Sequence, residues 1–436
     1  MKKIICFIAI LTIGSSLSFA QAEKSQTPVE RRAAEVCAQF RQNPGDYERL
    51  FATEFLAKIP AAQLTAIFTQ YFSQLGRCTT TKVSKAQSEN AAEFEFRFEK
   101  GFRVQVNISV NAPAPNLIDS LWFGNPTSLA SSLSDLTNEL KTLPGETSIL
   151  VARLSDESMI PLVAHNADRE LAIGSAFKLF VLTELAREVN ANERKLSDVV
   201  TLDDSAYSLP SGTLQTWPRG SPVTLHTLAA FMISISDNSA ADHLMKILGR
   251  ERVESALAET KHAKPQMDMP FLSTLELFKL KGEPTHKAAE QYLSLDVNGR
   301  RKFLAEQIAR VKREDAKPYP DGKPAYIDRI EWFASTSDLC RVMNWLRQKT
   351  EAGMPAAPLR DVLAINPGSG LNIPRERWSF IGFKGGSEPG VLNMTYLLRS
   401  TTAQWYAMSI SWNDAQSPLE IGRVIAIVQR ALQIIE

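Results

Sequence analysis

The hydrophobic pattern changes its period once near the start of the chain, and this change most limits how that part can fold. Between residues 29 and 76 apolar side chains recur at helical spacing, and the last of these helices is expected to end at Gly76. Apolar and polar side chains then alternate in two runs, 94–98 and 102–110. Helices followed by antiparallel strands predict a small α+β domain over residues 29–112.

The rest of the chain is expected to form a second, larger domain. Its 436 residues allow two or three domains in total. Prolines at positions 113 and 115 indicate a stiff, extended connection, so residues 113–128 are expected to be a linker and 129–436 one domain. Within it, the apolar runs 149–152 and 160–164 predict neighbouring strands of one sheet.

The N-terminus has the three-part pattern of a secretory signal. Lys2 and Lys3 precede an apolar run, and small residues follow near Ala20 and Ala22. The apolar run is shorter than the roughly 20 residues that a membrane-spanning helix needs. We therefore expect residues 1–22 to be a cleaved signal peptide. The mature protein would then be periplasmic or secreted, with no stable membrane anchor.

Charge and composition argue against several other classes of protein. Lys and Arg number 49 and Asp and Glu number 48, which gives no basic excess for nucleic acid. The five histidines form no H-x-x-x-H pair and the cysteines no C-x-x-C pair, so neither a metal nor another cofactor is expected. Cys37 and Cys78 could pair in an oxidising compartment, while Cys340 is expected to be a buried free thiol. A monomer is expected.

Ser175 and Lys178 form the motif S-x-x-K at the start of an apolar helical segment. The first turn of a helix has free N–H groups and the positive end of the helix dipole. Lys178 lies one turn further on the same face, where a neutral amine could take the hydroxyl proton of Ser175. The plainer interpretation is a helix-capping serine followed by a lysine that reaches the surface.

Ser236, Asp237 and Asn238 form a polar triplet between two predicted helices, 225–235 and 240–248. The triplet could simply cap the second helix. A serine and an asparagine in a loop are also residue types that can relay a proton and hold a substrate amide. Ser236 is therefore a candidate catalytic residue, and Asn238 is a candidate substrate-binding residue.

The third motif is Lys384-Gly385-Gly386-Ser387, which follows an apolar run typical of a strand. The two glycines would let a substrate lie flat against the strand edge. Lys384 could attract an anionic group. The backbone N–H of Ser387 could form an oxyanion hole together with that of Ser175. Lys384, Gly386 and Ser387 are thus candidate substrate-binding residues.

In this order, the three motifs resemble the active-site set of the penicillin-recognising serine hydrolases, namely the class A β-lactamases and penicillin-binding proteins. The resemblance covers about residues 129–436. It implies an α+β fold in which an antiparallel sheet is covered by helices, with an adjoining all-helical part. It also implies that Ser175 forms an acyl-enzyme with a small-molecule β-lactam or ester, that Lys178 is its base and that Ser236 relays a proton.

The domain order resembles a divergent two-domain subgroup of this superfamily, of the kind found in clavulanic acid biosynthesis. That resemblance implies that residues 29–112 form a cone-shaped α+β domain like those of steroid isomerases. It agrees with the helices-then-strands pattern of the same residues.

Two departures from the class A pattern bear on turnover. Gly385 stands where threonine or serine is usual, and no E-x-x-L-N pattern follows Asn238. That pattern supplies the glutamate that activates the deacylating water in class A enzymes. Glu276 is the nearest candidate for this base, and its unusual setting predicts slow deacylation. The alternative is a non-catalytic or very slow penicillin-binding or interaction protein with a degenerate hydrolase domain.

Overall fold

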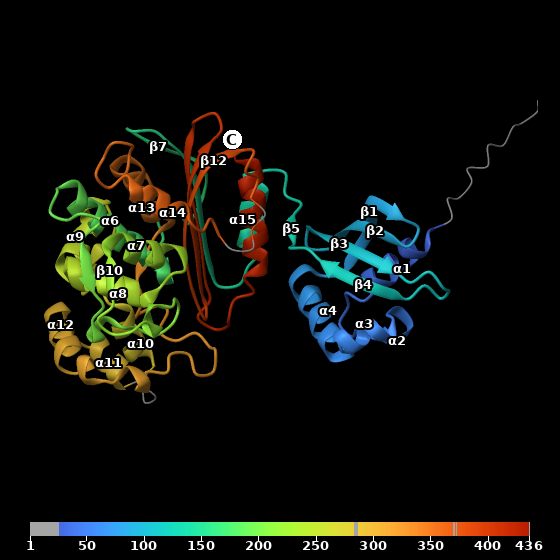
Figure 1. The fold of residues 1–436 in the computed structure, drawn as a ribbon, viewed down its shortest axis with the longest axis horizontal. Helices are drawn as coiled ribbons and strands as arrows, with labels where there is room; N and C mark the ends of the chain where they lie inside the picture. Colours follow the sequence, from blue (N-terminus) through green and yellow to red (C-terminus); the bar gives the residue numbers. More distant parts are fainter. Residues whose placement is uncertain (1–25, 283–286, 369–370, 372, 436) are drawn as a thin grey trace, which may run out of the picture.

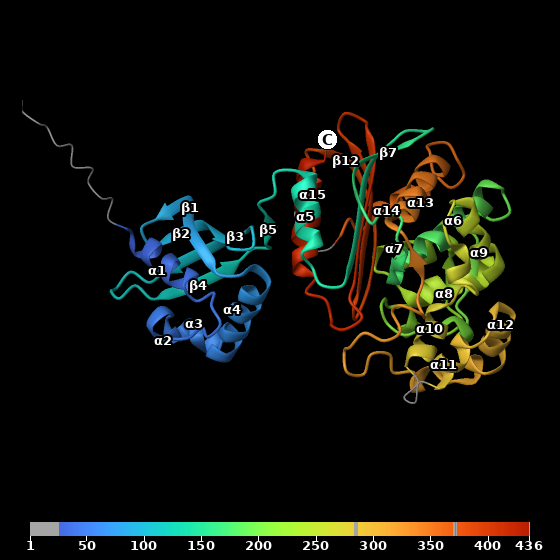
Figure 2. The ribbon, with the colours of Figure 1, turned by 180° about the vertical axis from the view of Figure 1, so that it is seen from behind.

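The computed structural model describes residues 26–282, 287–368, 371 and 373–435, which fold into two parts (Figure 1). The first part runs to about residue 128, and the second contains the rest. Figure 2 shows the same two parts from behind. The predicted signal peptide, residues 1–22, lies outside the described residues.

The first part consists of helices packed on one antiparallel sheet, with strand order β1-β2-β3-β4 and a short β5 beside β3. Its helices are α1 (Pro28–Cys37), α2 (Tyr47–Leu50), α3 (Thr53–Lys58) and α4 (Ala61–Leu75). Its strands are β1 (Cys78–Ser88), β2 (Ala91–Phe98), β3 (Phe102–Val110), β4 (Ile118–Phe123) and β5 (Thr127–Ser128).

The predicted alternation along β2 and β3 is confirmed. Phe94, Phe96 and Phe98 are buried, and the residues between them are more exposed. Phe40, which follows α1, packs edge-on against Phe96 and Phe98, and also against Phe68 of α4. These rings join the helices to the inner face of the sheet.

Three strands of this sheet differ from the prediction. β4 and β5 lie within residues 113–128, which were expected to be a linker, and both pair with β3. Ile118 of β4 is fully buried, so this segment belongs to the first domain. β1 was not predicted because most of its side chains are polar and exposed, and its backbone pairs only with β2 along one edge.

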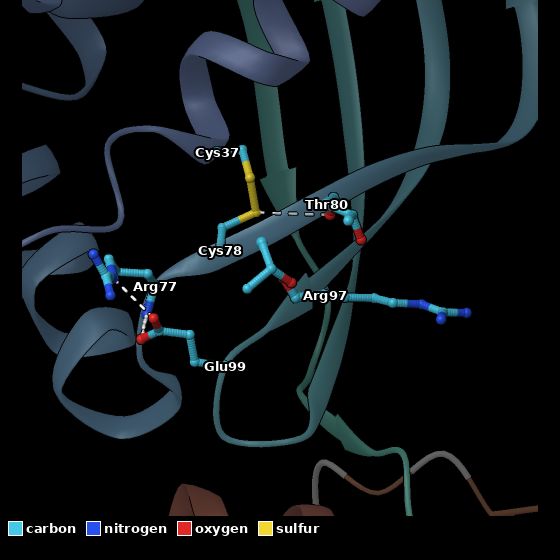
Figure 3. The surroundings of a disulfide bond; sticks show 7 residues. Cys37, Arg77, Cys78, Thr80, Arg97 and Glu99 are labelled. Carbon is cyan, nitrogen blue, oxygen red and sulfur yellow. Dashed lines mark hydrogen bonds and ion pairs between the residues drawn. A yellow bond between two sulfur atoms is a disulfide. The ribbon is translucent and has the colours of Figure 1, made fainter.

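Cys37 and Cys78 form a disulfide that joins the end of α1 to the start of β1 (Figure 3). Their Cα atoms lie 5.3 Å apart. Beside it, the Arg77 side chain pairs with Glu99. The bond therefore fastens the first helix to the edge strand of the sheet. Cys340 is buried and free.

The second part is built on an antiparallel sheet with strand order β12-β13-β14-β6-β7. The strands are β6 (Glu146–Leu154), β7 (Met159–His165), β12 (Trp378–Glu388), β13 (Val391–Ser400) and β14 (Trp405–Asn413). The expected pairing of the two apolar runs is confirmed, since Val151 lies opposite Val163. β12 is an edge strand.

Helices cover both faces of this sheet, as expected. On one face lie α5 (Leu133–Lys141) and α15 (Gly422–Ile434), which pack on Ile149 and Val151 of β6. On the other face, Leu150 and Ala152 join the larger helical core (Figure 1). Helix α5 begins directly after Ser132, whose side chain caps it.

The helical core contains α6 (Lys178–Asn190), α7 (Leu225–Ser234), α8 (Asn238–Leu248), α9 (Arg250–Glu259), α13 (Thr336–Lys349) and α14 (Pro358–Ala364). The polar region after residue 273 adds α10 (Thr274–Lys281), α11 (Lys287–Leu293) and α12 (Val297–Glu306). Two short two-stranded sheets complete the domain. One pairs β8 (Leu171–Ala172) with β11 (Phe333–Ala334), and the other pairs β9 (Val199–Thr201) with β10 (Pro222–Thr224). Among the described residues no helix combines the length and apolarity that a bilayer crossing requires.

The two parts meet through α15. Ala426 of this helix is fully buried and belongs to the apolar core of the first part. Close by, the Ser73 hydroxyl donates a hydrogen bond of 3.4 Å to the Glu420 carboxylate. Helix α15 thus packs both on the sheet of the second part and on the core of the first part.

Replacing both Cys37 and Cys78 with serine is expected to lower the free energy of unfolding of the N-terminal domain by about 2–4 kcal/mol, because the cross-link restricts the unfolded chain. Thermal melts of the oxidised wild type and the double variant measure this difference. Reductant should lower the Tm of the wild type alone. An equal response of both proteins to reductant would contradict the stabilising role of the bond.

Candidate active site

Ser175 lies in a 3-10 turn, Gly174–Phe177, that leads directly into α6. Gly174 has a φ of +48°, a conformation that favours glycine, and a Cβ atom there would lie only 3.1 Å from the Ser387 nitrogen of β12. The turn is therefore held between the buried helix α6 and an edge strand. Ser175 itself remains partly exposed.

Lys178 is fully buried, and its amine is surrounded by oxygen atoms. Its Nζ lies 3.1 Å from the Ser175 Oγ and 3.1 Å from the Ser236 Oγ. It lies 2.6 Å from the Ser236 carbonyl oxygen and 2.6 Å from the Asn238 Oδ1. The amine therefore connects the first two sequence motifs.

The loop that carries Ser236 is held in place by Asp237. Ser236 has a φ of +57°, in the left-handed region that few non-glycine residues adopt. The buried Asp237 carboxylate accepts hydrogen bonds from the backbone of Thr213, Leu214 and Ala240, at 2.6, 2.8 and 2.8 Å. These bonds cap α8 and fasten a neighbouring loop over the Ser236 turn.

Lys384 brings the third motif to the same place. It is buried, and its Nζ lies 3.1 Å from the Ser236 Oγ. It also donates to the Gly385 carbonyl of its own strand. The Ser236 hydroxyl therefore lies between two lysine amines. The structure brings together Ser175, Lys178, Ser236, Asn238 and Lys384.

The close approach of β12 to the Ser175 turn depends on Gly386. A Cβ atom at this position would lie 2.6 Å from the Ser175 nitrogen, so a larger residue could not fit without a shift. Ser387 is exposed, and its nitrogen is the atom that faces Gly174. The backbone nitrogens of Ser175 and Ser387 therefore lie in the same contact between turn and strand.

Burial weakens the basicity of both amines. It lowers the pKa of Lys178 well below the usual lysine value, and the nearby charge of Lys384 lowers it further. Burial also lowers the pKa of Lys384, to about 7. Both shifts favour the neutral amine near neutral pH.

In its neutral form, the Lys178 amine can accept a proton from a neighbouring hydroxyl. Its two shortest contacts are to the Ser236 carbonyl and the Asn238 Oδ1, which can only accept hydrogen bonds. The Asn238 Nδ2 donates to the Leu209 carbonyl at 3.0 Å, which fixes the direction of the amide. Both N–H groups of the amine are then used, and its lone pair is left for a hydroxyl proton.

The structure does not bring Glu276, the predicted base, to this group. One carboxylate oxygen of Glu276 pairs with Arg250 at 2.7 Å, and the other accepts from the Ser273 backbone at 2.8 Å. Glu276 is the third residue of α10, where it completes a capping box with Ser273. A glutamate three residues after a serine is also the usual start of a helix, and this capping role explains the contact with Ser273.

Two contributors were missed at the sequence level. For Asp237 the sequence does predict a helix cap, because an aspartate stands directly before an apolar helix. Its hydrogen bonds with residues 213 and 214 are non-local, so no local pattern indicates them. The Ser211 hydroxyl donates to the Ser236 carbonyl at 2.6 Å, and no local pattern indicates this contact.

Comparison with known proteins gives one family match. Residues 129–301 match the model of the beta-lactamase enzyme family, named Beta-lactamase2. This range contains the Ser175 and Ser236 motifs but not Lys384. No protein with a curated function matches the chain significantly in sequence.

Solved structures with a similar fold include a beta-lactamase from Sphaerobacter thermophilus, at 19% identity and a TM-score of 0.48, over 69% of this chain and 94% of that one. Another is PBP-A, at 15% identity and a TM-score of 0.47, over 70% and 96% of the two chains. A beta-lactamase from Francisella tularensis aligns at 13% identity and a TM-score of 0.49, over 69% and 99%. Over residues 129–301 the chain is therefore similar to the beta-lactamase enzyme family.

Proposed function

We propose that the protein is an exported serine hydrolase that forms an acyl-enzyme through Ser175 with a β-lactam or an ester. One observation carries this proposal. The buried Lys178 amine lies 3.1 Å from the Ser175 hydroxyl, and its other short contacts leave a lone pair for that hydroxyl's proton. A purely structural lysine would be expected to reach solvent or a carboxylate.

In the proposed acylation, Lys178 takes the proton of Ser175 as the Oγ attacks the carbonyl carbon of the substrate. The bond to the leaving nitrogen or oxygen then breaks. Ser236 donates its proton to that atom and is reprotonated by the Lys178 ammonium. The position of the Ser236 hydroxyl, 3.1 Å from the Lys178 amine, supports this relay.

The negative charge that develops on the carbonyl oxygen needs donors that are already in place. The backbone N–H groups of Ser175 and Ser387 are proposed to supply them, as supported by the close contact of their chain segments. Gly386 lets β12 approach the Ser175 turn, which brings these two donors together. Lys384 binds a substrate carboxylate, whose negative charge favours the protonated form of the amine. Asn238, whose two amide atoms contact Lys178 and the Leu209 carbonyl, orients the Lys178 amine.

Export is proposed from the signal-like N-terminus, and the disulfide supports it. Disulfides persist mainly in oxidising compartments such as the periplasm and the cell exterior. The Cys37–Cys78 bond lies in the domain that would be exported with the hydrolase.

Ser175→Ala is expected to abolish covalent labelling by a fluorophosphonate probe, because the attacking oxygen is gone. Ser236→Ala keeps the nucleophile but loses the proton relay to the leaving nitrogen, so its rate of labelling by a penicillin is expected to fall by about 10²–10⁴-fold. Time courses of covalent attachment measure both. Undiminished labelling of Ser175→Ala would place the nucleophile elsewhere, and no labelling of the wild type would favour a non-catalytic binding protein.

Lys384→Met is expected to change how stability depends on pH. In the wild type the folded pKa of Lys384 is about 7, and the unfolded chain has the usual, higher lysine value. Between these values the unfolded state binds more protons, so the free energy of unfolding of the wild type rises with pH. Relative to the variant, the rise should approach about 1.4 kcal/mol per pH unit above pH 7. Denaturant melts from pH 7 to 9.5 test this, and parallel curves for the two proteins would contradict a neutral Lys384.

Protein purified from the native host is expected to begin at Gln21 or Glu23, because signal peptidase would cleave after a small residue. N-terminal sequencing measures this directly. Recovery of residues 4–14 in the purified protein would rule out cleavage at these sites.

A further inference from the structure

A second buried charged cluster lies beside the candidate site, and the acylation chemistry does not use it. The Lys281 amine donates to Glu331 at 2.7 Å and to Glu388 at 2.5 Å. The Tyr319 hydroxyl donates to the other oxygen of Glu388. The side chains of Lys281 and Glu331 are fully buried. One lysine thus faces two carboxylates that come from distant parts of the chain.

This cluster flanks the turn that carries Ser175 from two sides. Glu331 precedes Trp332, whose carbonyl accepts a 3.0 Å hydrogen bond from the Ile173 backbone. Glu388 follows Ser387, whose nitrogen lies against Gly174. Both carboxylates are therefore attached to segments that contact the two residues just before the nucleophile.

Strand geometry places Glu388 on the face of β12 that contacts the Ser175 turn. β12 pairs regularly with β13 from residue 380 onward, so Lys384, Gly386 and Glu388 share one face. The Cβ position of Gly386 points at the Ser175 nitrogen, at 2.6 Å. Glu388 is the next residue on that face, about 7 Å further along the strand. Lys281 and Tyr319 hold its carboxylate beyond the Ser175 turn on this face.

Of the two carboxylates, only Glu388 has access to water. Both oxygens of Glu331 accept hydrogen bonds from protein groups, and none of its side-chain surface is exposed. The Glu388 side chain keeps 8% of its surface exposed. Burial and the nearby charge of Glu331 raise the pKa of Glu388 to about 8, which makes its carboxylate a stronger base than an ordinary glutamate.

We propose that Glu388 is the general base that deacylates the Ser175 acyl-enzyme; this rests on the proposed function. Glu388 removes a proton from water as the water oxygen attacks the carbonyl carbon of the Ser175 ester. The bond from that carbon to the Ser175 Oγ then breaks. The proton passes from Glu388 to the Oγ, and the free acid leaves. Lys281 and Tyr319 hold the carboxylate in position.

The test compares Glu388→Gln with Glu331→Gln, using p-nitrophenyl acetate and full-length protein. Both variants remove one partner of Lys281, so a merely structural cluster would affect both alike. Stopped-flow release of p-nitrophenolate gives the acylation rate from the burst and the deacylation rate from the steady phase. Intact-protein mass follows the acetyl group.

The expected result is a split between the two phases. In Glu388→Gln the burst should stay within about threefold of the wild type, while the steady phase falls by about 10²-fold or more and the acetyl-enzyme accumulates. In Glu331→Gln the steady phase should stay within about tenfold. Glu388→Asp, which keeps a carboxylate, should recover part of the rate and covers the case in which the glutamine variant does not fold.

Three results would overturn the proposal. The first is a steady phase in Glu388→Gln equal to that of the wild type. The second is an equal loss in both glutamine variants, or no recovery in a folded Glu388→Asp. The third is the absence of any Ser175 acetyl-enzyme in the wild type, which alone would overturn the proposed function as well.

Discussion

The arrangement of the whole site depends on the burial of the Lys178 amine. Lys178 has no contact with solvent, and its nearest oxygen atoms belong to hydroxyl, carbonyl and amide groups rather than to a paired carboxylate. Keeping a charge there would be costly, so the fold favours the neutral base that acylation requires. Burying this amine requires three segments that are distant in the sequence to pack around it, namely the Ser175 turn, the Ser236 loop and β12.

Backbone constraints achieve this placement. Gly174 and Ser236 adopt positive φ angles, and Gly386 lets β12 touch the Ser175 turn. Such conformations persist only when the surrounding structure holds them. Here the support comes from the buried helix α6 and from the buried carboxylate of Asp237, which is hydrogen-bonded to two neighbouring segments. The two buried amines and the strained loop thus lower the stability of the second domain.

The local spacing of apolar residues predicted several helices and strands correctly. The alternation at Phe94 and Phe96, the paired runs of β6 and β7, and the helices around Ser236 all appear in the structure. The two prolines before β4 predict a linker there. The segment is a strand because it pairs with β3, which lies before those prolines in the sequence. The motif residues could be named, but their contacts depend on segments up to about two hundred residues apart. Two glutamates illustrate this dependence on non-local structure. A local helix cap accounts for Glu276, whereas the position of Glu388 follows from the pairing of β12 in the sheet, which the sequence does not reveal.

The central claim is that Ser175 becomes acylated by a substrate of the class this site is built to hold. Intact-protein mass after incubation with a penicillin, followed by peptide mapping, tests it most directly. The account predicts a mass increase equal to one penicillin, carried by the peptide that contains Ser175. An unmodified protein, or an adduct mapped to a different residue, would contradict it.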